Sequence, residues 1–133
     1  MNKIEHIGIA VKSLEVSNVI FEKLFGVPRY KEEEVASEGV KTAFYQNGPN
    51  KIELLEATNP ESPIAKFIEK KGEGIHHIAF DVDNIFSEIE RLKSEGFVVL
   101  NDKPKKGADN KLVTFLHPKS TNGVLIELCQ EIR

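Results

Sequence analysis

Segments with alternating apolar and polar positions are interleaved with segments of helical periodicity along this chain. Residues 4–11 alternate and are rich in β-branched side chains, which predicts a strand. Residues 13–26 have a helical pattern, with Ser13 suited to an N-cap and Gly26 to a stop. One face of this predicted helix is apolar throughout and consists of Val16, Val19, Ile20 and Leu24.

A second helix is predicted to begin near Asp83 or Asn84 and to end at Gly96. Its apolar side chains lie at helical spacing and are Ile85, Ile89 and Leu92. Short strands follow each of these two helices, because turn signals interrupt the sequence there. Two such signals are Asn47-Gly48-Pro49 and Asn122-Gly123.

A third helix is predicted within residues 60–72. Ser62 suits its N-cap, Pro63 its first position and Gly72 its end. Its buried side chains are expected to be Ile64, Phe67 and Ile68.

The second half of the chain repeats the pattern of the first. His6-Ile7-Gly8-Ile9-Ala10-Val11 corresponds to His77-Ile78-Ala79-Phe80-Asp81-Val82, roughly 70 residues later. Each half then has a helix and ends on a strand-like run with one central carboxylate, Glu53 or Glu127. This order predicts an α+β fold of two tandem β-α-β-β-β modules. We expect one domain, residues 1–133, with repeat halves 1–59 and 73–133 and a bridging helix 60–72.

Four polar residues occupy strand positions where the pattern predicts core: His6, Glu53, His77 and Glu127. A carboxylate in a buried strand is costly unless it is paired, protonated or bound to a metal. The two halves place one histidine and one glutamate at equivalent positions, so a pseudo-twofold arrangement of the halves would bring all four together. Two imidazoles and two carboxylates suit a divalent cation such as Zn, Co, Ni or Mn.

Each of these residues taken singly has a structural interpretation. A lone strand histidine is more often hydrogen-bonded than ligating, and Glu53 alone is equally compatible with a solvated sheet face. His76 is predicted to point away from His77, because neighbouring strand residues face opposite sides. His117, at a strand end, and Cys129 are predicted to be structural.

Composition limits the classes of function. The chain has 133 residues, 40% hydrophobic and 29% charged, and a formal net charge of −3. The mild acidity argues against nucleic acid as a partner. The single cysteine excludes an internal disulfide and fits a reducing cytoplasm, and neither a membrane span nor a signal peptide is expected.

The residues at these strands resemble the vicinal oxygen chelate (glyoxalase) superfamily, and within it the methylmalonyl-CoA epimerases. The resemblance spans almost the whole chain. It is carried by Glu5–Val11, the helix start Ser62-Pro63-Ile64, the double histidine of Gly74–Ala79, and Phe115–Lys119 with Gly123–Leu128. It implies a curved mixed sheet around a metal site, and metal ligation by His6, Glu53, His77 and Glu127.

The resemblance also implies interconversion of (R)- and (S)-methylmalonyl-CoA by α-proton abstraction through a metal-stabilised enolate. Some epimerases carry a further glutamate where this chain has Thr42. Glu127 is therefore the first candidate for the mobile carboxylate, and Glu53 the second. Coenzyme A phosphates require positive charge, for which we single out Lys105, Lys106 and Lys119. A homodimer is expected.

Two alternatives stay open at this point. Lactoylglutathione lyase (glyoxalase I), which acts on the hemithioacetal of methylglyoxal and glutathione, has the same fold and ligand pattern. A non-catalytic ligand-binding member of the fold would hold no metal. A ring-cleaving dioxygenase is disfavoured by the second glutamate and by the short chain.

Overall fold

The computed structural model describes all residues from 1 to 133, and it has a mixed α+β fold, as the sequence predicts. The strands are β1 (Lys3–Ala10), β2 (Lys31–Val35), β3 (Val40–Asn47), β4 (Asn50–Ala57), β5 (Gly74–Asp81), β6 (Lys105–Lys106), β7 (Lys111–Leu116) and β8 (Ile126–Glu131). The helices are α1 (Leu14–Phe25), α2 (Pro63–Lys71) and α3 (Ile85–Ser94), and short 3-10 turns occupy Ala36–Glu38, Ala108–Asn110 and Pro118–Ser120. The order β-α-β-β-β occurs before α2 and again after it.

The chain forms two compact units. One unit, here called the terminal unit, consists of Met1–His6 and His77–Arg133, and the other, the central unit, consists of Ile7–His76. The first six residues therefore pack with the second half of the sequence. The division into repeat halves 1–59 and 73–133 is a statement about sequence similarity and stays a prediction.

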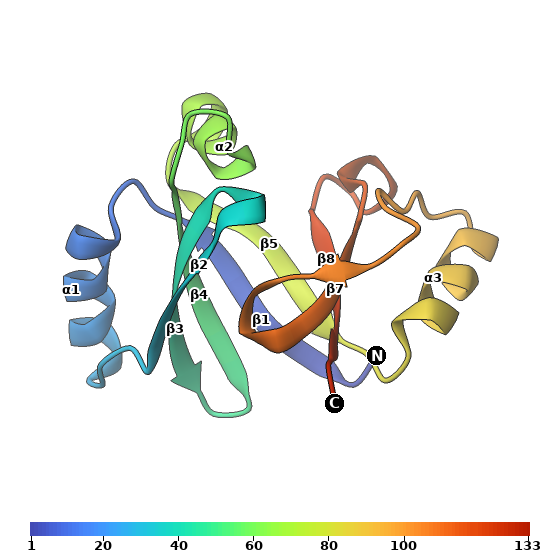
Figure 1. Cartoon of the computed structure of the whole chain (residues 1–133), viewed down its shortest axis with the longest axis horizontal. Coiled ribbons are helices and arrows are strands. Elements are labelled where there is room, and N and C mark those ends of the chain that lie inside the picture. The colour runs from blue at the N-terminus through green and yellow to red at the C-terminus, as the bar shows by residue number, and fades with distance from the viewer. The chain divides into compact units, whose positions relative to one another are not determined.

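The central unit is a sheet with a helix on each face. Its strand order is β2-β3-β4-β1, and β2–β3 and β3–β4 are antiparallel pairs. Helix α1 lies along one face, where Leu14 packs with Tyr45 and Leu54 (Figure 1). Helix α2 packs on Leu55 and Val40, from the opposite face, through Ile64.

The apolar face predicted for α1 points outward and is not part of the core. Its side chains are strongly exposed: Val16 62%, Val19 52%, Ile20 57% and Leu24 69%. The buried face instead carries Leu14, Ser17 and Asn18. The polar side chain of Asn18 is accepted there because the Tyr45 hydroxyl donates a hydrogen bond of 2.6 Å to Asn18 Oδ1. Burial raises the pKa of the Tyr45 hydroxyl, so it stays a donor.

The terminal unit has strand order β1-β5-β8-β7-β6. Strand β8 runs parallel to β5 and antiparallel to β7, and the two-residue β6 ends the sheet. Helix α3 covers one face (Figure 1), where Ile85, Ile89 and Leu92 pack with Leu116 and Leu128 as predicted. The opposite face of the same strands carries Ala79, Val113 and Cys129.

The predicted helix starts and the predicted ends at Gly26 and Gly72 are confirmed, whereas α3 ends at Ser94, two residues before the predicted Gly96. Ser13 accepts a hydrogen bond from the Val16 amide, Ser62 accepts one from the Ile64 amide, and Asn84 accepts from two amides of α3. Gly26 ends α1 with a φ of 73°, a left-handed conformation that glycine adopts without strain. None of the helices is both long enough and apolar enough to cross a membrane.

Replacing Ile89 by Ala is expected to lower the free energy of unfolding by about 2–5 kcal/mol, because the side chain is fully enclosed between α3 and the sheet. Urea unfolding of the wild type and the variant measures the difference. Glu90→Ala, on the exposed side of the same helix, is the control and should stay within about 0.5 kcal/mol. Equal midpoints for Ile89→Ala and the wild type would contradict this assignment of the core.

Candidate metal centre

Three of the four predicted ligands meet in the terminal unit. His6 comes from β1, His77 from β5 and Glu127 from β8, and all three are buried. In the register of β5 and β8, Glu127 is paired with Ala79, and Ala79 lies two residues after His77 on β5. Their candidate ligand atoms all lie within 4.8 Å of one another. We call these three residues the cluster.

The nitrogens that face inward are the Nε2 atoms of both imidazoles. They are 3.0 Å apart, and Glu127 Oε1 lies 3.2 Å from His77 Nε2 and 3.7 Å from His6 Nε2. Burial alone would raise the pKa of Glu127, but its contacts with His6 and His77 outweigh burial and lower it below its ordinary value. The cluster therefore holds Glu127 as a carboxylate.

These residues fit a divalent cation. Imidazole nitrogen and carboxylate oxygen are donors that first-row metals accept. With bonds of about 2.1 Å, neighbouring ligand atoms lie about 3.0 Å apart in an octahedron and about 3.4 Å apart in a tetrahedron. The observed separations of 3.0, 3.2 and 3.7 Å bracket these values, so an ion requires only small movements of the side chains.

Two charged residues beside the cluster were not singled out as site residues by the sequence analysis. Glu5 is buried, and its Oε1 lies 3.0 Å from His6 Nδ1. Lys111, also buried, lies 4.0 Å from Glu5 Oε2 through its Nζ. Alternation along a strand gives neighbouring residues opposite faces, so the pattern did not associate Glu5 with His6. The signal available in the sequence was the charge of Glu5 directly beside His6, at the start of the apolar run from Ile7 to Ala10.

An aromatic ring and a thiol lie on the same face of β7 and β8 as Glu127. Phe115 packs edge-on against His77, with ring centroids 5.9 Å apart, and stands opposite Glu127 in the strand register. Cys129 is fully buried beside Val113, and burial raises the pKa of its thiol. The thiol is therefore held neutral and packs as a core side chain, as the sequence predicts.

The fourth predicted ligand, Glu53, lies on β4 in the central unit. It is buried and stands opposite Phe44 in the register of β3 and β4. Strand β4 corresponds to β8 in the internal sequence repeat, so a buried carboxylate on β4 agrees with that repeat. Its role as a ligand stays a prediction.

The remaining predicted residues have defined places. Lys105 and Lys106 form β6 and Lys119 lies in the 3-10 turn after β7, and all three are exposed. Their predicted contact with substrate is untested. His117 accepts a hydrogen bond from the Lys119 amide, and the ring of His76 packs edge-on against Phe67 at 4.9 Å. Both histidines therefore have structural contacts, as predicted.

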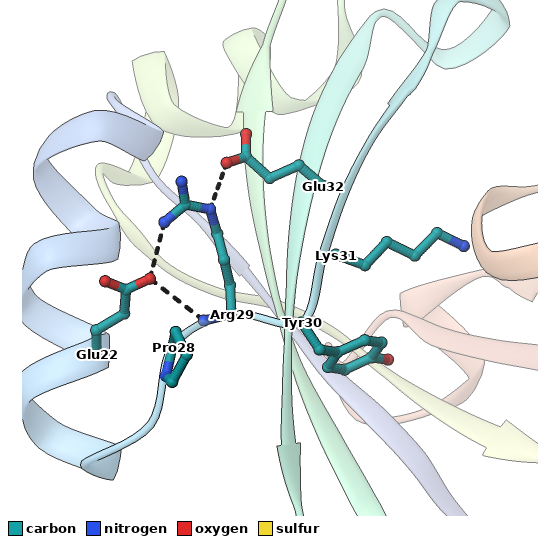
Figure 2. Close-up of a pocket in the computed structure, with 6 residues that line it drawn as sticks. All are labelled: Glu22, Pro28, Arg29, Tyr30, Lys31 and Glu32. Atoms are coloured by element: carbon teal, nitrogen blue, oxygen red, sulfur yellow. Dashed lines mark hydrogen bonds and ion pairs between the residues drawn. The ribbon is translucent and has the colours of Figure 1, made fainter.

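A surface hollow of about 500 Å³ in the central unit lies between the end of α1 and β2. Figure 2 shows Arg29 at its centre, between Glu22 and Glu32. Arg29 donates to Glu22 Oε2 over 2.7 Å from its side chain and over 3.2 Å from its amide, and its Nε donates to Glu32. The guanidinium is therefore engaged by two carboxylates and links α1 to β2.

This chain is similar to known proteins over nearly its whole length. The Glyoxalase/Bleomycin resistance protein/Dioxygenase superfamily model matches residues 5–115. The ethylmalonyl-CoA/methylmalonyl-CoA epimerase of Cereibacter sphaeroides is 39% identical over 98% of this chain and 98% of its own length. A solved structure of a hypothetical protein from Bacillus halodurans is 46% identical, with a TM-score of 0.96 over 99% of this chain and 96% of that chain.

A Streptomyces coelicolor methylmalonyl-CoA epimerase in complex with 2-nitronate-propionyl-CoA is 32% identical and superimposes with a TM-score of 0.92. The match covers 98% of this chain and 95% of that one. The resemblance inferred from the sequence is therefore confirmed, and with it the fold class. This chain belongs to the Glyoxalase/Bleomycin resistance protein/Dioxygenase superfamily.

Proposed function

We propose that this protein is a divalent-metal-dependent epimerase that interconverts (R)- and (S)-methylmalonyl-CoA. The observation that carries the proposal is the convergence of His6, His77 and Glu127 in one buried cluster. It is supported by relatives named for this activity, including one that is matched over 98% of its own length and whose name adds ethylmalonyl-CoA. An acyl-CoA is therefore the proposed substrate class.

The reaction takes the proton from the carbon between the thioester and the carboxylate and returns a proton to the opposite face. A divalent cation, when bound, supplies electrostatic stabilisation for the negative charge that develops on the thioester oxygen. His6, His77 and Glu127 would hold this ion, with Glu53 as the proposed fourth ligand. Co, Ni, Zn and Mn all suit this donor set.

Glu127 is the proposed proton acceptor, with Glu53 second. A general base works best when its pKa lies near the working pH, whereas the contacts with His6 and His77 lower the pKa of Glu127. Glu127 is therefore a weak base while both imidazoles contact it. We propose that it accepts the proton after it separates from at least one of them. Thr42, which the sequence places where some epimerases carry a glutamate, is buried and bonds the Glu33 carbonyl.

The chain is proposed to act as a homodimer through α1, in a cytoplasmic location. The outward face of Val16, Val19, Ile20 and Leu24 is a continuous apolar stripe of the kind that marks association sites. Glu15 precedes this stripe and Lys23 lies near its end. In an antiparallel pair of α1 helices with a twofold axis at Val19, Glu15 of each copy faces Lys23 of the other. The stripe therefore fits a second copy of this chain.

Incubation of methylmalonyl-CoA with the Co²⁺-loaded protein in deuterated water is expected to exchange the α-proton, detected by NMR. His77→Ala is expected to lose metal affinity and exchange by about 100-fold or more, because it removes a ligand atom. His117→Asn, which removes an imidazole outside the cluster, is the matched control. Absence of exchange in the loaded wild type, together with turnover of the methylglyoxal–glutathione hemithioacetal, would favour lactoylglutathione lyase. Absence of bound metal would favour a ligand-binding protein.

Glu127→Gln keeps the size of the side chain but removes its ability to accept a proton. Epimerisation by this variant, measured at saturating metal, is expected to fall by about 10²–10⁴-fold. Glu88→Gln on α3 replaces a half-buried carboxylate outside the cluster and should leave the rate unchanged. A Glu127→Gln protein with its metal and full activity would exclude Glu127 as the acceptor.

Ile20→Glu is expected to convert the proposed dimer to a monomer in light-scattering measurements, because it would bury two like charges in the apolar stripe beside the twofold axis. Phe86→Glu, at an exposed apolar position on α3, is the control. Lys23→Glu should weaken the dimer, and Glu15→Lys combined with it should restore association. A wild-type monomer at micromolar concentration, or no effect of Ile20→Glu, would contradict this interface.

A further inference from the structure

A buried ion pair stands directly behind one histidine of the cluster. Glu5 is 3% exposed and Lys111 is 9% exposed. The two oxygens of Glu5 have different partners, since Oε1 lies 3.0 Å from His6 Nδ1 and Oε2 lies 4.0 Å from Lys111 Nζ. The contacts Lys111–Glu5–His6 therefore form a line that ends at His6 Nε2, the atom that faces His77 and Glu127.

The contact with Glu5 selects one tautomer of the His6 imidazole. A carboxylate oxygen can only accept a hydrogen bond, so Nδ1 must carry the proton that it donates to Glu5. In the neutral ring this leaves the lone pair on Nε2. Nε2 is the atom 3.0 Å from His77 Nε2. Glu5 thus directs the electron pair of His6 toward the centre of the cluster.

The buried carboxylate of Glu5 is tolerated because Lys111 compensates its charge. A buried charge without a partner is strongly unfavourable. Lys111 lies on β7, on the same face as Val113 and Phe115 because positions two apart share a face. One strand therefore supplies both the cation that compensates Glu5 and the ring that packs on His77.

We propose that Glu5 is a positioning residue for the metal centre: it fixes the tautomer and orientation of His6, and Lys111 is its buried ion-pair partner. This inference rests on the proposed function for the identity of the site as a metal centre. The ring state of His6, in contrast, is a property of the metal-free protein. The positioning role of Glu5 and the proposed metal centre can therefore be disproved independently of each other.

The competing interpretation is that Glu5 and Lys111 form an ion pair that serves stability alone. Both interpretations expect a change in stability when the pair is broken. Only the positioning role expects a change in the His6 ring and in metal affinity when stability is preserved. The double variant Glu5→Gln/Lys111→Met removes both charges while keeping side-chain length, so neither residue is left buried and unpaired.

The first measurement is ¹⁵N NMR of the imidazoles in the metal-free protein, with the His6 signals assigned by their loss in His6→Gln. The wild type is expected to show the proton on Nδ1 of His6. Glu5→Gln should produce a mixture of tautomers, because an amide either accepts or donates. Glu88→Gln, which removes a carboxylate charge paired with Arg91 in the same unit, is the control and should leave the His6 signals unchanged.

The second measurement is titration of the metal-free proteins with Co²⁺. Glu5→Gln and the double variant are both expected to bind about 10–100-fold more weakly than the wild type, the usual effect of removing a hydrogen-bond partner of a ligating histidine. Lys111→Met alone should lower the melting temperature, and the addition of Glu5→Gln should recover part of that loss. If Glu5→Gln does not fold, the double variant and the wild-type spectrum still decide the question.

Two results would overturn the positioning role. One is a wild-type His6 with its proton on Nε2. The other is a folded Glu5→Gln or double variant with wild-type His6 signals and wild-type Co²⁺ affinity. A wild type that binds no divalent ion would instead remove the proposed metal centre, while the His6 spectra would still report whether Glu5 controls the ring.

Discussion

The burial of ionisable groups on strands is the constraint on which the terminal unit depends. Two imidazole nitrogens lie 3.0 Å apart, and a carboxylate oxygen lies 3.2 Å from one of them, on three buried side chains. Such groups are stable in an interior only when each has a partner of matching charge or hydrogen-bonding character. Glu5, Lys111 and the register that sets Glu127 opposite Ala79 together provide those partners.

In the terminal unit, the apolar core and the ionisable cluster lie on opposite faces of the strands. In the terminal unit α3 covers the face of Leu116 and Leu128, while Glu127 and its neighbours occupy the other face. In the central unit α1 covers the face of Tyr45 and Leu54. The period of two along a strand makes this separation possible, because changes on the helix-covered face leave the orientation of the polar face intact.

The sequence predicted what periodicity and internal repetition determine. Helix α3 was predicted with its buried residues because Ile89 and its neighbours repeat at helical spacing. The pairing of His6, His77 and Glu127 followed from the repeat, since equivalent strand positions held the same kinds of side chain. The outward direction of α1 was not predictable in this way. Its most apolar face is exposed, and its buried face includes Asn18, whose partner Tyr45 lies in a different element.

Glu5 and Lys111 show a second limit of the sequence pattern. Strand alternation assigns neighbouring residues to opposite faces, and a lysine is ordinarily expected at the surface. Both expectations fail here because one tertiary contact compensates both charges. A contact between residues so far apart in the sequence leaves no local signal in either segment.

The division of the chain between its two units has a consequence for the order of folding. The central unit is one continuous segment, Ile7–His76, whereas the terminal unit joins the first six residues to everything after His76. During synthesis, the contacts within the central unit become available first, and the contacts of His6 with Glu127 wait until nearly the whole chain has been made. Closing so long a loop is entropically slow. The assembly of the cluster is therefore a late event, and a nascent chain carries its first histidine without the other donors that would let it capture an ion.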